Sequence, residues 1–153
     1  MAVLTLVSDQ LAADYRRSTR EEHGKVRFAY FKSTSTADGD IGTTVDLVKL
    51  PQGAVRVLPG LSRLSVGACG ASRTLSIGHT AYAKDGSGTQ EALNATAFVN
   101  ALDVSSAVNG VAFGTGVKYD MYSTSGVTVQ AKIAGGTLPN TTVIEGYVAY
   151  VTE

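Results

Sequence analysis

Apolar and polar residues alternate with a period of two along most of the chain from residue 25 onward. This alternation is typical of β-strands that bury one face and expose the other. The clearest segment is 127–133, in which the odd-numbered residues are apolar and the even-numbered residues are polar (Val127, Val129, Ala131 and Ile133 against Thr128, Gln130 and Lys132). The same pattern predicts further strands at 26–30, 44–47, 55–57, 64–66, 74–77 and 117–122.

Two of these segments have unusual faces. In the first, Val26, Phe28 and Tyr30 share one face, and Lys25 and Arg27 lie opposite. The last segment, 142–152, is apolar on both faces. A strand of that kind is covered on both sides, either centrally in a sandwich or against a neighbouring subunit.

Glycine, proline and asparagine separate the predicted strands, and all three prolines fall in these breaks, as a sheet requires. Residues 92–103 fit either a short helix or an irregular strand, and we favour the helix. About eight short strands joined by turns predict an all-β fold, an antiparallel β-sandwich. A jelly roll is the first topology we expect and an immunoglobulin-like sandwich the second.

Charge separates the N-terminal segment from the remainder. Residues 9–32 hold 10 of the 26 charged residues, and we interpret 1–24 as an arm outside a β-sandwich domain of residues 25–153. Ser8 is a suitable N-cap and Gly24 a suitable C-terminal residue, so the arm is predicted to be partly helical. Its apolar face holds only Leu11 and Tyr15, so such a helix needs a partner surface.

Composition excludes several classes of function. The 13 basic and 13 acidic residues cancel, which argues against a nucleic-acid partner. No apolar stretch is long enough to span a membrane. The single cysteine, Cys69, excludes an intramolecular disulfide and a metal site made of several cysteines.

Catalytic chemistry has few candidate residues. His23 and His79 lie 56 positions apart without a third histidine, so we expect no metal site. Glu145 lies in the middle of the last predicted strand, and no second carboxylate is predicted to face it across a cleft, as a glycosidase requires. We therefore predict no catalytic residues, no metal, no cofactor and no enzymatic activity.

Tyrosines and arginines are the candidate contact residues. Tyrosine on the outer face of a strand suits a subunit interface, because its ring buries area while its hydroxyl finds a partner. On this ground we predict a homo-oligomer, a trimer in preference to a dimer, with Tyr122, Tyr147 and Tyr150 at its interface. In the arm, we predict that a partner protein contacts Tyr15, Arg16, Arg17 and Arg20.

One run of residues carries a resemblance to a known family. The segment Val45-Asp-Leu-Val-Lys-Leu-Pro-Gln-Gly-Ala54 fits a "Val-x-Leu-x-x-Leu-Pro-x-Gly-Ala" pattern that precedes an aliphatic strand. Together with Leu75-Ser-Ile-Gly78 and Gly146-Tyr-Val-Ala-Tyr-Val151, it resembles small structural proteins of tailed bacteriophages, over residues 26–151.

This resemblance implies a head decoration, or cement, protein with a jelly-roll-like domain. Such a protein is made in the host bacterial cytoplasm and sits on the capsid exterior, where it braces joints between subunits of the major capsid protein. Two alternatives stay open: a neck or tail component of the same virion, and a carbohydrate-binding β-sandwich. The absence of tryptophan argues against the second.

Overall fold

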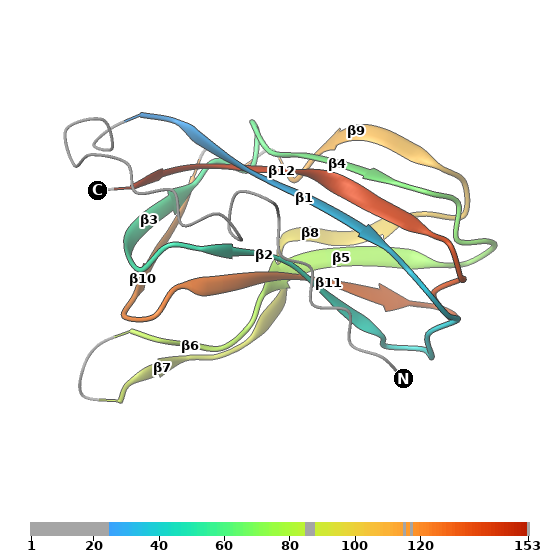
Figure 1. The fold of residues 1–153 in the computed structure, drawn as a ribbon, viewed down its shortest axis with the longest axis horizontal. Helices are drawn as coiled ribbons and strands as arrows, with labels where there is room; N and C mark the ends of the chain where they lie inside the picture. The colour runs from blue at the N-terminus through green and yellow to red at the C-terminus, as the bar shows by residue number, and fades with distance from the viewer. Residues whose placement is uncertain (1–24, 85–87, 115, 117, 153) are drawn as a thin grey trace.

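A computed structural model describes residues 25–84, 88–114, 116 and 118–152, and these form two packed antiparallel sheets (Figure 1). The predicted Tyr15, Arg16, Arg17 and Arg20 contacts and the predicted arm helix lie outside the described residues. The strands of the larger sheet are β1 (Arg27–Thr34), β3 (Gly53–Val57), β4 (Arg63–Val66), β9 (Val108–Ala112), β10 (Tyr119–Ser123) and β12 (Val143–Thr152). The smaller sheet has β2 (Thr44–Leu50), β5 (Thr74–His79), β8 (Asn94–Asp103) and β11 (Val127–Ala134).

The order of the strands confirms a β-sandwich with jelly-roll topology. In the larger sheet, β12 pairs with β1 on one side and with β3 and β4 on the other, and these pair in turn with β10 and β9. The smaller sheet has the order β2-β11-β5-β8. If β3–β4 and β9–β10 are each counted as one interrupted strand, the sheets are ordered 1-8-3-6 and 2-7-4-5, which is the jelly-roll arrangement.

A buried serine closes the interruption between β3 and β4. The turn containing Pro59 and Gly60 separates these two strands, although both pair with the same strand, β12. Ser62 lies in the gap, completely buried, and its hydroxyl donates to the carbonyl of Leu58 and accepts from the backbone N–H of Ala149. The side chain thus satisfies a buried β12 donor that no strand partner reaches at this point.

The core lies between the two sheets and is built from the inward positions of both. Leu47, Ile77 and Val129 from the smaller sheet and Leu64 and Val148 from the larger one have no exposed surface. In β11 the four apolar residues of the predicted inward face are all buried, which confirms the alternation there.

The predicted helix at 92–103 is wrong, because residues Asn94–Asp103 form strand β8. This strand pairs with β5, and the register shifts twice, between Leu75 and Ile77 and between Ile77 and His79. Strand β8 has one residue more than β5 across the first shift and three more across the second, so side chains beyond each shift change faces. Ala101 also has a positive φ of 50°. As a result, the apolar residues of β8 do not alternate with a period of two, and their spacing is close to that of an amphipathic helix.

The polar loop near 83–91 belongs to a small hairpin that projects from the sandwich (Figure 1). Its strands are β6 (Tyr82–Ala83) and β7 (Gln90–Glu91), with an ion pair between Lys84 and Glu91. The backbone N–H of Thr124 donates to the carbonyl of Ala83 over 3.0 Å and joins the hairpin to the end of β10. In the described part of the chain, no helix is long and apolar enough to cross a membrane.

Candidate interaction surface

Three aromatic side chains gather on the outer face of the larger sheet. Tyr30 of β1 lies directly opposite Tyr147 of β12, and Phe28 lies two residues earlier on β1. The ring centroid of Tyr147 is 5.3 Å from that of Phe28 and 5.5 Å from that of Tyr30, both in edge-on arrangements. These distances are those of mutually attractive aromatic pairs. The three residues form one cluster, called the aromatic surface below.

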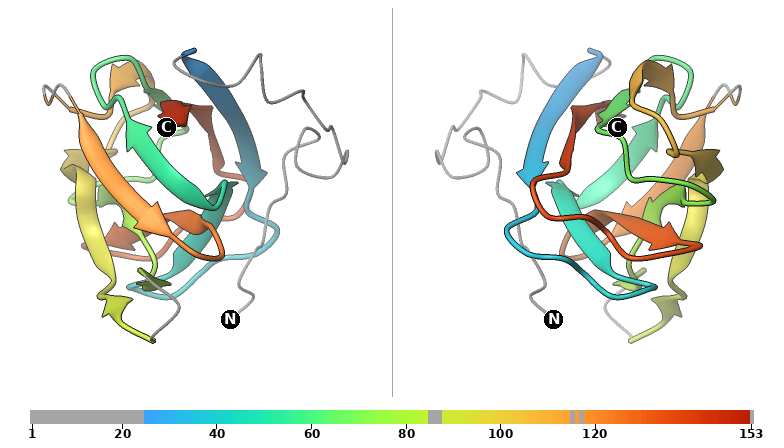
Figure 2. Two further views of the ribbon diagram at one scale, coloured as in Figure 1. Left: turned by 90° about the vertical axis from the view of Figure 1, so that its left-hand side faces the viewer. Right: turned by 90° about the vertical axis from the view of Figure 1, so that its right-hand side faces the viewer.

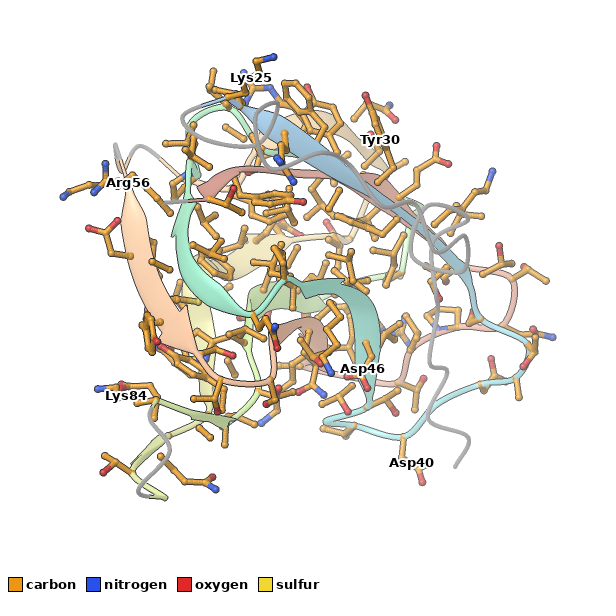
Figure 3. The ribbon with its side chains drawn as sticks, turned by 60° about the vertical axis from the view of Figure 1, so that its left-hand side comes forward. Lys25, Tyr30, Asp40, Asp46, Arg56 and Lys84 are labelled. Carbon is orange, nitrogen blue, oxygen red and sulfur yellow. The ribbon has the colours of Figure 1, made fainter. Side chains whose placement is uncertain are left out.

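The aromatic surface is open to solvent. Phe28 is 42% and Tyr30 51% exposed, and Val26, which precedes β1, is 44% exposed. Tyr30 projects from β1 away from the body of the sandwich (Figure 3). The inward positions of β1 are instead Ala29, Phe31 and Ser33. The apolar face Val26-Phe28-Tyr30 is therefore the solvent side of the strand.

The outer face of the smaller sheet is different in character. Its outward positions carry hydroxyl, amide and charged groups, with the side-chain amide of Gln130 donating to Asp46 over 2.7 Å. Asp46 lies on the opposite side of the sandwich from Tyr30 (Figure 3). The outer face of the smaller sheet is thus polar, whereas the outer face of the larger sheet carries the exposed aromatic surface. Exposed apolar patches of this kind mark interaction sites.

The strand that carries Phe28 and Tyr30 is also a sheet edge. Among the described strands, β1 pairs with β12 and with no other, and it lies at the margin of the sandwich (Figure 2). Farther along the same face, Lys32 and Glu145 form an ion pair of 3.3 Å between half-exposed side chains. The surface is thus an aromatic cluster bordered by the edge strand of the described sheet and by one charged pair. An open edge offers backbone donors and acceptors to another strand.

The three tyrosines predicted for a subunit interface occupy different environments. Tyr147 belongs to the aromatic surface. Tyr122 is 57% exposed and lies on β10, across the sheet from β1. Tyr150 is turned inward and packs against the core. The structure therefore brings Tyr147 together with Phe28 and Tyr30, and it does not bring the three predicted tyrosines to one place.

Sequence reasoning placed Phe28 and Tyr30 on a shared face and did not identify them as contact residues. A signal for their exposure exists, because Phe31 on the opposite face is itself a large apolar residue. When a strand carries aromatic residues on both faces and only one face packs in the core, the aromatic residues of the other face are left on the surface.

Surface charge near β10 is arranged in a small network. Asp120 accepts a hydrogen bond of 2.7 Å from Arg56 and forms an ion pair of 3.0 Å with Lys118. These two partners lower the pKa of the Asp120 carboxyl below its usual value. All of these groups are exposed, so the network is a hydrated surface feature with a small effect on stability.

The two side chains with potential catalytic chemistry in the described part of the chain, those of His79 and Cys69, are buried. His79 is buried, and its Nε2 lies within hydrogen-bond distance of the hydroxyl of Tyr119, at 3.1 Å. A carbonyl can only accept, so the Nδ1–H of His79 donates to the carbonyl of Thr80. Burial raises the pKa of the Cys69 thiol, which disfavours the reactive thiolate. Within the described residues, no group of three or more His, Cys, Asp or Glu side chains could hold a metal ion.

Comparison with known proteins gives a likeness of fold. No family model matches the sequence, and no curated protein matches it. Two solved structures contain a chain of similar fold. One is described as "Capsid of Ralstonia phage GP4", with a TM-score of 0.60 and 18% identity over 98% of this chain and 99% of that chain. The other is described as "Cyanophage Pam1 capsid asymmetric unit", with a TM-score of 0.53 and 18% identity over 92% of this chain and 96% of that chain.

Proposed function

We propose that this chain is a non-enzymatic structural protein of a bacteriophage virion. In this proposal it decorates the outer surface of the head and stabilises joints between subunits of the major capsid protein. The observation that carries the proposal is the likeness of nearly the whole chain to chains of two phage capsid structures. The likeness covers 92% and 98% of this chain and 96% and 99% of the two neighbours, which supports a role of the same kind.

The division of the chain into an arm and a sandwich gives this role two parts. Residues 1–24 anchor the protein, with Tyr15, Arg16, Arg17 and Arg20 contacting the major capsid protein, while 25–153 form the sandwich. Arginine pairs bidentately with carboxylates, and hydrogen bonds to charged groups contribute about 1.5–3 kcal/mol each when they are shielded from water. In solvent the same pairs contribute about 0–1 kcal/mol, so the three arginines matter only in a docked arm.

Self-association is the other part of the proposal. The protein forms a homo-oligomer, a trimer in preference to a dimer, and sits on the capsid exterior. The aromatic surface supports this, since it presents apolar area at a sheet edge where a second protein surface can cover it.

A density map of the virion tests the location. We expect the sandwich to fit density on the outside of the head, over joints between major capsid subunits. Density at the neck or along the tail would overturn the decoration role and would favour a neck or tail component of the same virion.

Decoration of capsids that lack the protein tests the anchor. We expect loss of residues 1–24 to leave the sandwich folded, to weaken capsid binding and to lower the temperature at which the capsid opens. Replacing Arg16, Arg17 and Arg20 by alanine should reproduce part of the loss. A matched control replaces three exposed lysines of the described chain, Lys25, Lys49 and Lys132, which removes the same charge. Equal occupancy of the arginine and lysine variants would contradict the anchor.

A further inference from the structure

The aromatic surface is not explained by the packing of a single chain. Phe28 and Tyr30 keep 42% and 51% of their surface exposed in the single chain, although buried aromatic rings are among the largest contributors to core and interface stability. The core side of β1 is complete without them, because Phe31 is 3% exposed and packs on Phe113 with centroids 6.5 Å apart. A surface of this composition on the edge strand of the described sheet is suited to a segment that arrives from outside the fold.

An extended apolar segment would match both features of this surface. Alternate backbone groups of an edge strand point away from the sheet, and a peptide that adds as a further strand satisfies them. Its alternate side chains then lie over the outer face, in contact with Phe28 and Tyr30. Such a segment needs about five or six residues, high β-propensity and no charge at the contact.

The sequence contains one such segment in the residues that precede the described part of the chain. Residues 2–7, Ala-Val-Leu-Thr-Leu-Val, are uncharged and rich in β-branched and aliphatic side chains. Residues 8–24 join this segment to Lys25, next to the start of β1. Seventeen residues can span up to about 58 Å when extended. The tether is therefore long enough for the segment to reach the β1 edge of a neighbouring copy.

We propose that residues 2–7 of one copy add as a strand to the outer edge of β1 in a second copy and cover its aromatic surface. Each copy then donates one segment and receives one. An exchange of this head-to-tail kind closes into a ring when the rotation between copies permits it, and three copies form the smallest ring beyond a reciprocal dimer. The inference deepens the proposed self-association and rests on it. It does not depend on capsid binding.

Cross-linking between two different variants tests the donor and the acceptor directly. In a Cys69→Ala background, one variant carries Leu4→Cys in the segment and the other carries Lys32→Cys on the outer face of β1. We expect a short bis-maleimide to join the two variants when they are mixed, giving a product of twice the mass of one chain. A chain that carries both cysteines and cross-links only internally would overturn the proposal, since the segment would then cover its own β1. The absence of any cross-link would also overturn it.

Sedimentation of substituted proteins tests the surface itself. Replacing Phe28, Tyr30 and Tyr147 by threonine keeps β-propensity and removes the rings, and we expect self-association to weaken by at least ~10-fold, as for clustered aromatic interface residues. Leu93→Thr, which removes an exposed apolar side chain between β7 and β8, outside the larger sheet, is the control and should leave self-association unchanged.

Loss of residues 1–7 separates this inference from the proposal on which it rests. We expect the shortened chain to be monomeric with an unchanged denaturation midpoint. If it remains an oligomer, segment exchange is wrong and self-association stands. If the full chain is itself monomeric, both in solution and on capsids, self-association and the exchange both fail.

Discussion

Replacing Ser62 by alanine should destabilise the sandwich well beyond the usual effect of losing one hydroxyl group. The Ser62 hydroxyl accepts a 2.9 Å hydrogen bond from the backbone N–H of Ala149 and donates a 3.0 Å bond to the carbonyl of Leu58. Both Ser62 and Ala149 are completely buried, so the substitution leaves the Ala149 N–H without a partner and without water. An unsatisfied buried donor costs about 1–3 kcal/mol.

The loss at Leu58 adds little, because its carbonyl still accepts from the backbone N–H groups of Leu61 and Ser62. We therefore expect Ser62→Ala to lower the free energy of unfolding by about 2–3 kcal/mol. For a chain of this size, this corresponds to a fall of about 4–12 °C in Tm. Urea titration followed by circular dichroism measures the change, and the slope of the transition should be unaltered.

Ser65→Ala provides a matched control for this prediction. The Ser65 hydroxyl also accepts a backbone N–H, that of Gly110, over the same 2.9 Å, but this bond is exposed. Water replaces the lost acceptor, so we expect a change within about 0.5 kcal/mol. If Ser62→Ala and Ser65→Ala destabilise the protein equally, the burial of the Ala149 N–H is not the source of the cost, and the reasoning about the interrupted strand fails.

Two further predictions concern the polar groups of the sandwich. Tyr119→Phe removes the hydroxyl that forms a hydrogen bond with Nε2 of buried His79 and should cost about 1–2 kcal/mol in urea titration, whereas an unchanged midpoint would show that this hydrogen bond contributes nothing. Arg56 and Lys118 lower the pKa of Asp120 in the folded chain, so its ionised form adds stability above the unfolded value near 3.8, and this contribution is lost as the pH falls through the lower folded pKa. Asp120→Asn should therefore flatten the decline of the denaturation midpoint between about pH 5 and pH 2, and a profile identical to that of the unsubstituted protein would contradict the assignment.

The fold class was predictable from sequence because the sandwich depends on a repeated local signal. Each strand that buries one face has a two-residue period, and glycine and proline mark the breaks. In β11 this signal identified all four buried positions. Gly126 directly precedes β11, and its positive φ of 89° shows why a glycine stands at this break.

The error at β8 has a local cause. Its pairing with β5 contains two irregularities, and each one moves later side chains to the other face. A bulge depends on the partner strand as much as on the strand itself, so the sequence of β8 alone does not predict where the pairing becomes irregular. The apolar residues that remain then have a spacing close to that of a helix.

The candidate surface shows most clearly what the sequence determined and what the tertiary structure decided. The alternation in β1 separates Phe28 and Tyr30 from Phe31, and that separation is a property of the sequence. Which of the two faces turns inward depends on the volume that the opposite sheet leaves to be filled, and here Phe31 fills it beside Phe113. The meeting of Tyr147 with Tyr30 depends in the same way on the register between β12 and β1, strands more than one hundred residues apart. Because burial and register arise from long-range packing, only the folded chain could place three aromatic rings together on the solvent side of the larger sheet.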